Sequence, residues 1–174
     1  MRDANRPTEQ EDRQPIVNIV GEKVALGPLR RGLVTLYHKW HDDFEVMRFA
    51  GTMRPTSLEA EEDRYARVSK AENHADFTIF AKPWLAPIGT TGLNYIDYDN
   101  RTAEFGIMIG DKGSWDKGYG TEVTRLMLDY GFNCLGLHNI NLWVNAANER
   151  GISAYRRAAC KRVRVSVAKP TTTS

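Results

Sequence analysis

The stretch GSWDKGYGTEVTRLMLDYGF, Gly113 to Phe132, joins a glycine-rich loop to the start of a long amphipathic pattern. Gly118 and Gly120 flank Tyr119 at the point where the helical spacing begins. The unpaired N–H groups at the start of a helix and the positive end of its dipole bind phosphate well, and glycine lets the backbone come close to the anion. The stretch therefore predicts a strand-to-helix junction that holds a phosphate-bearing ligand, with a plain glycine turn as the alternative.

The pattern after Gly118 predicts a helix with one apolar face. Its apolar residues recur at spacings of three and four, which places them on one stripe. The members of this stripe are Val123, Leu126, Met127, Tyr130, Cys134 and Leu137. Two other anion-binding motifs do not fit. A P-loop needs lysine where this chain has Tyr119, and a Rossmann fingerprint needs a small residue where it has Val123.

The segments on both sides of this helix alternate between strand and helix patterns. Period-two alternation and turn residues predict strands over residues 23–30, 76–82, 88–97, 102–110, 139–145 and 162–167. Helical spacing predicts helices over residues 34–50, 57–72 and 148–159. Asp42 and Asp43 mark the start of a second helix within the first of these ranges, and Ser57 and Asn148 stand at cap positions. The order predicts a single α/β (α+β) domain.

Length and composition are those of one globular domain. The chain has 174 residues, of which 41% are hydrophobic and 26% are charged. Its net charge of +2 is too small to favour nucleic acid or an anionic membrane as a partner. We expect a flexible N-terminal arm over residues 1–15, a folded domain over residues 16–168 and a flexible tail over residues 169–174.

Targeting signals and metal-binding patterns are not evident in the sequence. No apolar run approaches the roughly 20 residues of a membrane-spanning helix, and residues 1–15 lack the apolar core of a signal peptide. A cytoplasmic location is therefore expected. Cys134 and Cys160 are interpreted as buried free thiols, and His38 and His41 as one helix face rather than a pair of metal ligands.

Three longer segments carry a resemblance to a known family. They are IGTTGLNYID, RTAEFGIMIGDKGSWDKGYGTEVTRLMLDYGF and LWVNAANERGISAYRRA, and DDFEVMRF near the start adds to them. In this order they resemble the GNAT superfamily of acyl-CoA-dependent N-acyltransferases, and in particular the subgroup that includes the ribosomal-protein N-terminal acetyltransferases. The likeness covers about residues 24–158. It implies a single-domain GNAT fold with a mixed central sheet flanked by helices, and acetyl-CoA as co-substrate without a metal.

The resemblance also implies which residues bind the cofactor. The loop from Trp115 to Gly120 corresponds to the family's pyrophosphate loop, and the preceding strand would pair with the pantetheine arm. One N–H of that strand, near Ile107 or Met108, would face the thioester carbonyl. The implied cofactor contacts are Ile107, Met108, Ile109, Trp115, Lys117, Gly118, Tyr119, Gly120, Thr121 and Asn148.

Two residues are candidates for the chemistry. An acceptor amine with a pKa near 10 must lose a proton before or during attack, and Glu104 matches a glutamate often found beside the cofactor strand. Tyr155 matches the tyrosine that protonates the departing CoA thiolate. The alternatives are a solvated strand residue for Glu104 and a core aromatic for Tyr155. Four further aromatic residues either line the acceptor pocket or cover the core: Trp40, Trp84, Tyr95 and Tyr98.

The C-terminal end departs from the family pattern. Ala159 and Cys160 replace the usual glycine and phenylalanine, and one strand follows where family members have two, so the C-terminal strand region is shortened. Either residues 162–167 pair directly with residues 139–145, or a second subunit covers the exposed edge. We therefore expect a homodimer as the assembly.

The leading functional hypothesis is an N-acetyltransferase. It would move an acetyl group from acetyl-CoA to a primary amine of a peptide, a protein N-terminus or a small molecule, including antibiotic-type amines, by direct attack in a ternary complex. The alternative is a catalytically weakened CoA-binding regulatory or interaction module.

Overall fold

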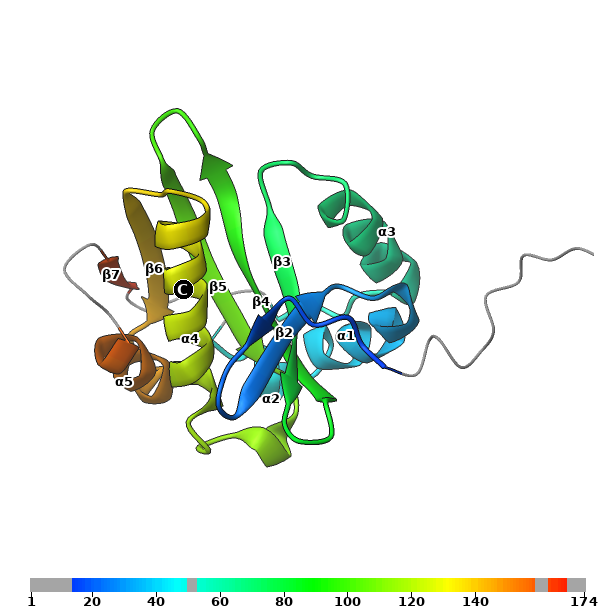
Figure 1. The fold of residues 1–174 in the computed structure, drawn as a ribbon. Coiled ribbons are helices and arrows are strands. Elements are labelled where there is room, and N and C mark those ends of the chain that lie inside the picture. The colour runs from blue at the N-terminus through cyan, green and yellow to red at the C-terminus, as the bar shows by residue number, and fades with distance from the viewer. Residues whose placement is uncertain (1–13, 50–52, 159–162, 169–174) are drawn as a thin grey trace, which may run out of the picture.

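Seven strands form one central sheet in the computed structural model, which describes residues 14–49, 53–158 and 163–168 (Figure 1). Their bounds are β1 Ile19–Val20, β2 Val24–Pro28, β3 Ala75–Ala81, β4 Ala86–Asp97, β5 Thr102–Ile109, β6 Asn139–Asn145 and β7 Val163–Ala168. All six strands expected from the sequence are present within a few residues of their predicted limits, and β1 is added. The expected arm up to residue 13 and the tail over residues 169–174 lie outside the described residues.

The strands lie in the order β1-β2-β3-β4-β5-β6-β7. Neighbours from β1 to β5 are antiparallel, whereas β5–β6 and β6–β7 are parallel. Parallel neighbours need a crossover, and helices α4 and α5 supply the two crossovers. The sheet is therefore mixed, as the resemblance implied.

The helices follow the predicted order. Their bounds are α1 Val34–His41, α2 Phe44–Met47, α3 Leu58–Val68, α4 Tyr119–Asp129 and α5 Glu149–Ala158, with short 3₁₀ turns at Arg31–Leu33 and Lys112–Ser114. The predicted caps Ser57 and Asn148 are confirmed, since each accepts a backbone N–H from the first turn of its helix, α3 or α5. Asp43, at the predicted start of α2, accepts the N–H of Glu45. Helix α3 ends at Val68, short of the predicted end at residue 72.

Helices cover both faces of the sheet (Figure 1). The alternating side chains of β5 show which side each residue faces: Ala103 and Phe105 belong to the large core with α4 and α5, whereas Met108 packs against α1. On the α1 face, Tyr37 and Trp40 are buried. The two faces of β5 therefore pack against different helices, α4 and α5 on one side and α1 on the other.

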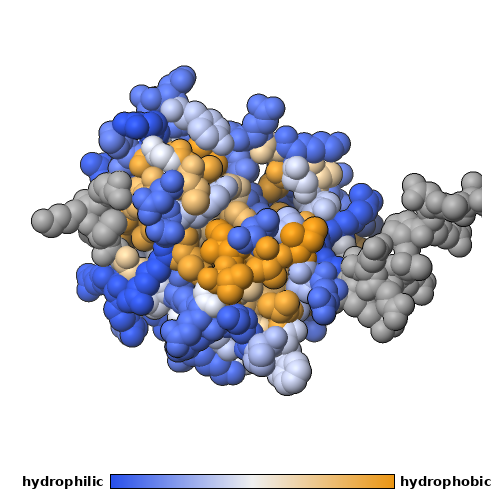
Figure 2. Space-filling model, viewed as in Figure 1, coloured by the Kyte–Doolittle hydropathy of each residue, from blue (hydrophilic) through white to orange (hydrophobic). Residues whose placement is uncertain are grey.

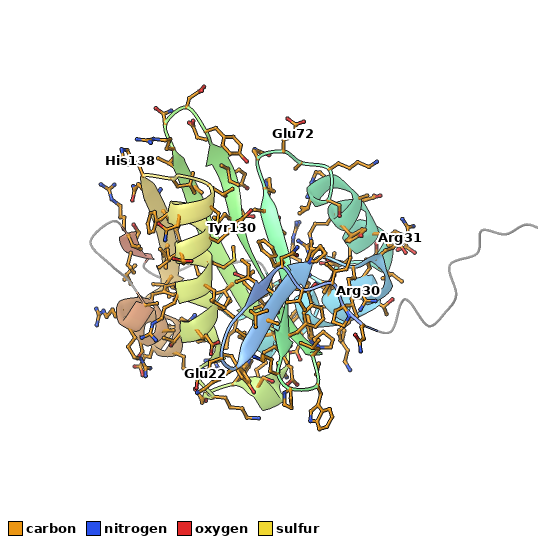
Figure 3. All side chains as sticks on the ribbon, viewed as in Figure 1. Glu22, Arg30, Arg31, Glu72, Tyr130 and His138 are labelled. Atoms are coloured by element: carbon orange, nitrogen blue, oxygen red, sulfur yellow. The ribbon has the colours of Figure 1, made fainter. Side chains whose placement is uncertain are left out.

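Helix α4 is continued by a π-helical turn, Tyr130–Cys134, where Tyr130 meets Phe77 edge-on at a centroid distance of 5.5 Å (Figure 3). The wider turn advances the helical phase, so Cys134 leaves the predicted apolar stripe, whereas Leu137, which follows the helix, is buried in the same core as Val123. Cys134 is exposed, and the prediction of a buried thiol there is wrong. Cys160 lies outside the described residues.

The C-terminal strand resolves one of the two alternatives. Strand β7 pairs directly with β6 in parallel, with Ile140 opposite Val163 and Val144 opposite Val167. Ala159 and Cys160, where the chain departs from the family pattern, lie outside the described residues. Because β7 occupies the edge of β6, no second subunit is needed to cover that edge, and the expected homodimer stays a prediction.

An apolar surface area lies on the face of the molecule where β1 and β2 run (Figure 2). The large exposed side chains of this region include Ile16 and Val20, which are 69% and 66% exposed. Apolar areas of this kind mark surfaces at which a homodimer contact would be sought first.

Within the described part of the chain, no helix has the length and apolar character needed to cross a membrane.

Candidate active site

A cavity of about 590 Å³ runs through the region where β5 and β6 separate. The last residue pair between these strands is Phe105 with Leu142, and beyond it the strands diverge. The loop before α4 and the helix α5 close one side of the opening, and α1, α2 and α3 approach from the other. The cavity therefore reaches both faces of the sheet at one point of β5.

The backbone of β5 presents N–H groups to this opening. The N–H of Gly110 donates to Ile88 of β4 at 2.9 Å, and the β4–β5 register is regular from there to Glu104. Backbone groups alternate in direction along a strand, so the N–H of Met108 faces β4 and the N–H of Ile107 faces the opposite edge. Ile107 is thus the first residue past the last β5–β6 pair with its N–H toward the opening.

The glycine-rich loop reaches the cavity with bare backbone. Gly118 adopts φ +82°, a left-handed conformation that favours glycine, and α4 begins at Tyr119. A Cβ added at Gly120 would meet no atom within 4 Å, so the protein leaves open space above this residue. Gly118, Tyr119, Gly120 and Thr121 all line the cavity. The first turn of α4 therefore presents its N–H groups to an empty space.

Trp115 and Arg150 brace the start of this loop. The indole N–H of Trp115 donates to the carbonyl of Ile109 at 2.8 Å, and the guanidinium of Arg150 lies 4.3 Å from the centroid of the Trp115 ring. Arg150 also approaches Asp116 at 3.4 Å. Sequence reasoning missed Arg150, which brings a cation from α5 to the cavity wall; its place two residues after the cap Asn148 was the available signal.

Lys117 points toward a separate hollow. This hollow, of about 500 Å³, lies behind the loop and is lined by Lys23, Lys82 and Lys117 together with Glu22, Pro83 and Tyr119. Glu22 is labelled in Figure 3 at the end of the sheet where the loop before α4 runs. Of the ten expected cofactor contacts, Lys117 alone falls outside the lining of the larger cavity. The Lys117 charge therefore lies near the loop, but Lys117 lines the smaller hollow rather than the larger cavity.

Helix α5 brings Tyr155 into the cavity wall. The side chain of Asn148 accepts the N–H of Gly151 at 2.9 Å and thereby fixes the start of the helix. Tyr155 is 7% exposed and packs edge-on against Phe105 at 5.8 Å between ring centroids. Burial raises the pKa of Tyr155 to about 12. The phenol therefore stays protonated at neutral pH and remains available as a proton donor.

Glu104 lies on the opposite face of the sheet from Tyr155. It is half-buried on β5 between Asn94 of β4 and Asn141 of β6, and it shares its face with Gly106 and Met108. Its side chain is outside the lining of the cavity, next to Gly106, which lines it. The two expected catalytic side chains thus lie on opposite faces of the sheet.

An ionic cluster supports the α1–α3 side of the cavity. Glu61 of α3, only 2% exposed, accepts hydrogen bonds from Arg64 at 2.7 Å and from His41 at 3.0 Å. Burial by itself raises the pKa of the Glu61 carboxyl, but these two hydrogen bonds outweigh burial and hold the pKa below its ordinary value. His41 and Arg64 line the cavity, so Glu61 fixes two of its wall residues.

Replacing Glu61 with Gln is expected to lower the free energy of unfolding by about 1.5–3 kcal/mol, the range for a hydrogen bond to a charged group. Because the folded-state pKa is lowered, the contribution is present above the unfolded pKa of about 4.3 and disappears as the pH falls through the folded value. Urea unfolding at pH 7 and at pH 3 measures this contribution of Glu61 to the free energy of unfolding. Glu62→Gln, at an exposed neighbour on α3, is the matched control, and a Glu61→Gln difference that did not decrease from pH 7 to pH 3 would contradict the assignment.

The remaining sequence-based candidates lie away from the cavity. Trp40 belongs to the buried cluster under α1, and Trp84, Tyr95 and Tyr98 are exposed, so none of these four aromatic residues lines the acceptor side. His38 bonds the carbonyl of Thr56, whereas His41 bonds Glu61. Across the described ranges, no group of three or more His, Cys, Asp and Glu residues is placed to hold a metal ion.

Comparisons with known proteins agree with this geometry. The Acetyltransferase (GNAT) domain family matches residues 23–161. A solved structure of spermidine N-acetyltransferase from Vibrio cholerae, in complex with CoA and spermine, is 26% identical at a TM-score of 0.73, covering 79% of this chain and 80% of that one.

Curated relatives extend the same likeness. Spermidine N(1)-acetyltransferase of Escherichia coli K12 is 29% identical over 77% of this chain and 70% of its own length. Human alpha/beta-tubulin-N-acetyltransferase 9 is 29% identical over 85% of this chain and 77% of its own length. The uncharacterized N-acetyltransferase p20 of Bacillus licheniformis is 38% identical, and the match spans less than half of either protein, 44% of this chain and 42% of p20.

Proposed function

This chain belongs to the GNAT acetyltransferases, a family that uses acetyl-CoA as co-substrate, and from that premise we propose that it acetylates a primary amine of a small aliphatic polyamine. The observation that carries the proposal is the cavity that crosses the sheet at β5. It joins a helix start able to bind a diphosphate to a wall that contains Asp76 and also Glu45, which is paired with Lys112 at 2.6 Å. A cationic acceptor and an anionic donor therefore have separate places in one space.

The donor lies along the loop and β5. The N–H groups at the start of α4 bind the diphosphate, and the open space over Gly120 admits it. Arg150 adds positive charge beside Trp115. The pantetheine arm then follows the edge of β5 that β6 leaves, and the N–H of Ile107 faces the thioester carbonyl. Lys23, Lys82 and Lys117 offer a second place for anionic groups of the same ligand.

The reaction is a direct acyl transfer. The amine nitrogen attacks the thioester carbon, and the oxygen that gains negative charge is stabilised by the Ile107 N–H. The tetrahedral intermediate collapses, the C–S bond breaks, and Tyr155 gives its proton to the leaving thiolate. The amine's surplus proton passes to Glu104 on the acceptor face, through water because Glu104 stands beside the cavity rather than in its wall. The products are the amide and free CoA.

Replacing Glu104 with Gln is expected to lower kcat/KM at pH 7 by about 100-fold, the low end of the range for general-base catalysis, because water carries the proton. The deficit should shrink toward pH 10, where the acceptor amine is itself deprotonated. Steady-state rates from pH 6 to pH 10 measure this. Glu72→Gln is the control, since Glu72 is exposed at the far end of the sheet (Figure 3). A deficit that is independent of pH would rule out the base role.

The spermidine N-acetyltransferase relatives support a polyamine as the acceptor. A protein amine is the second candidate, because the likeness to human alpha/beta-tubulin-N-acetyltransferase 9 extends over 85% of this chain. A protein α-amine, which the resemblance to ribosomal-protein acetyltransferases implies, stays a prediction. A CoA-binding module without catalysis is less favoured, since Tyr155 and Asn148 both line the cavity.

The experiment that tests the function follows the release of free CoA thiol with acetyl-CoA and a panel of amines. The panel contains spermidine, 1,4-diaminobutane, a peptide with a free α-amine and a lysine peptide with a blocked N-terminus. We expect the polyamines to react with the highest kcat/KM. Preferential reaction of a peptide would favour the second candidate. CoA binding without thiol release from any amine would favour the non-catalytic module.

A further inference from the structure

A row of three residues crosses the sheet on its acceptor face. Asp76 of β3 stands opposite Gly92 of β4, and Gly92 stands opposite Gly106 of β5. Residues directly opposite each other in antiparallel strands point to the same face. Because Gly92 and Gly106 have no side chains, this face has a shallow trough that runs from Asp76 over Gly92 to Gly106. All three residues line the cavity. The trough ends one residue before Ile107, whose N–H faces the thioester position.

The carboxylate of Asp76 lies in this trough with one oxygen unsatisfied. Its Oδ1 is 2.5 Å from the position that a Cβ on Gly92 would occupy, so the carboxylate lies over Gly92. Its Oδ2 is buried and has no hydrogen-bond partner in the described part of the chain. The nearest basic side chain is His74, whose Nδ1 is 3.6 Å from Oδ2 and also lies 3.1 Å from Asn94 Oδ1.

A buried carboxylate oxygen without a hydrogen bond is costly, and a cation bound by the carboxylate offsets part of that cost. Burial raises the pKa of Asp76, and the neighbouring His74 and Arg64 oppose this increase only in part. An ammonium ion placed in the trough would donate to the carboxylate oxygen over Gly92 and favour the charged form of Asp76. The site therefore suits a small cation that enters along the cavity.

We propose that Asp76 binds the non-reacting ammonium group of a diamine or polyamine and so places the second amine at the thioester. The inference rests on the proposed acetyl transfer, and it assigns the residue that selects diamines and polyamines as acceptors. Neighbouring strands are about 4.8 Å apart, so the carboxylate over Gly92 is roughly one strand from Gly106. Two nitrogens joined by three or four methylenes are about 5 to 6 Å apart in an extended chain. The spacing selects aminopropyl and aminobutyl groups over single amines.

The test compares acceptors and variants by steady-state kinetics. Wild-type protein and Asp76→Asn are assayed with 1,4-diaminobutane and with butylamine, which has the same carbon chain but one amine. Asp76→Asn should raise KM for the diamine by about 10- to 100-fold, the effect of losing a charged hydrogen bond, and leave kcat/KM for butylamine unchanged. Asp63→Asn, at an exposed site on α3, removes the same charge as a control.

A second variant tests the trough without changing charge. Gly92→Ala puts a methyl group where the Asp76 carboxylate now lies, and it should also remove the preference for the diamine. CoA affinity by calorimetry should match wild type for both variants, which shows that they fold. If wild type acetylates the diamine and both variants retain its preference, the assignment of Asp76 is overturned. If wild type acetylates no amine, the proposed function fails as well, and with it the inference.

Discussion

Replacing Tyr155 with Phe is expected to lower kcat by about 10²- to 10⁴-fold, the range for loss of a positioned acid. The change removes one oxygen from a buried ring and keeps the contact with Phe105, so packing is preserved. Without the phenol, the CoA sulfur must leave as an unprotonated thiolate. The affinity for CoA should change little, because the phenol acts on the leaving group and not on the diphosphate.

Release of CoA thiol at saturating substrates measures the effect, and calorimetry measures CoA binding. Tyr95→Phe is the matched control, since Tyr95 is 65% exposed and outside the cavity. The pH dependence gives an independent check. The acid form of Tyr155 is present below its pKa of about 12 and is lost only above it. The rate should therefore rise with pH as the acceptor loses its proton, with no decline from Tyr155 up to about pH 10. A Tyr155→Phe variant with wild-type kcat would disprove the acid role.

Replacing Gly120 with Glu is expected to weaken CoA binding by on the order of 100-fold, because its carboxylate would face the diphosphate at close range. The same change should leave the melting temperature equal or slightly higher in the absence of ligand. A Cβ at Gly120 meets no atom within 4 Å, and a negative charge in the first turn of a helix is favourable. The affinity for CoA should thus fall, whereas the melting temperature of the ligand-free protein should not.

Thermal unfolding with and without CoA, together with calorimetry, separates these two effects. Gly118→Ala is the contrasting variant, since Gly118 has φ +82° and alanine there costs about 1–2 kcal/mol. It should lower the melting temperature of the ligand-free protein, which Gly120→Glu should not. An unchanged dissociation constant for Gly120→Glu would mean that the diphosphate does not bind at the start of α4.

Much of the site was predictable because its signals are local. The caps Asp43, Ser57 and Asn148, the glycine loop and the helix after it each depend on residues within a few positions of one another. The prediction for Cys134 failed because helical spacing assumes a constant phase, and the π-helical turn at Tyr130–Cys134 changes it. The roles of Glu104 and Tyr155 stay predictions until the variants are measured.

The order of strands and helices along the chain and the bare backbone at the start of α4 follow from the amino-acid sequence, since short-range spacing and backbone freedom decide these. Which distant residues meet follows from the packing of the folded chain. Asp76, Gly92 and Gly106 form one row because of strand register, and Arg150 reaches Trp115 because α5 packs beside the loop. β7 likewise pairs directly with β6. Such contacts depend on how strands pair across long stretches of chain, and one-residue shifts in that pairing would move each side chain to the other face of the sheet.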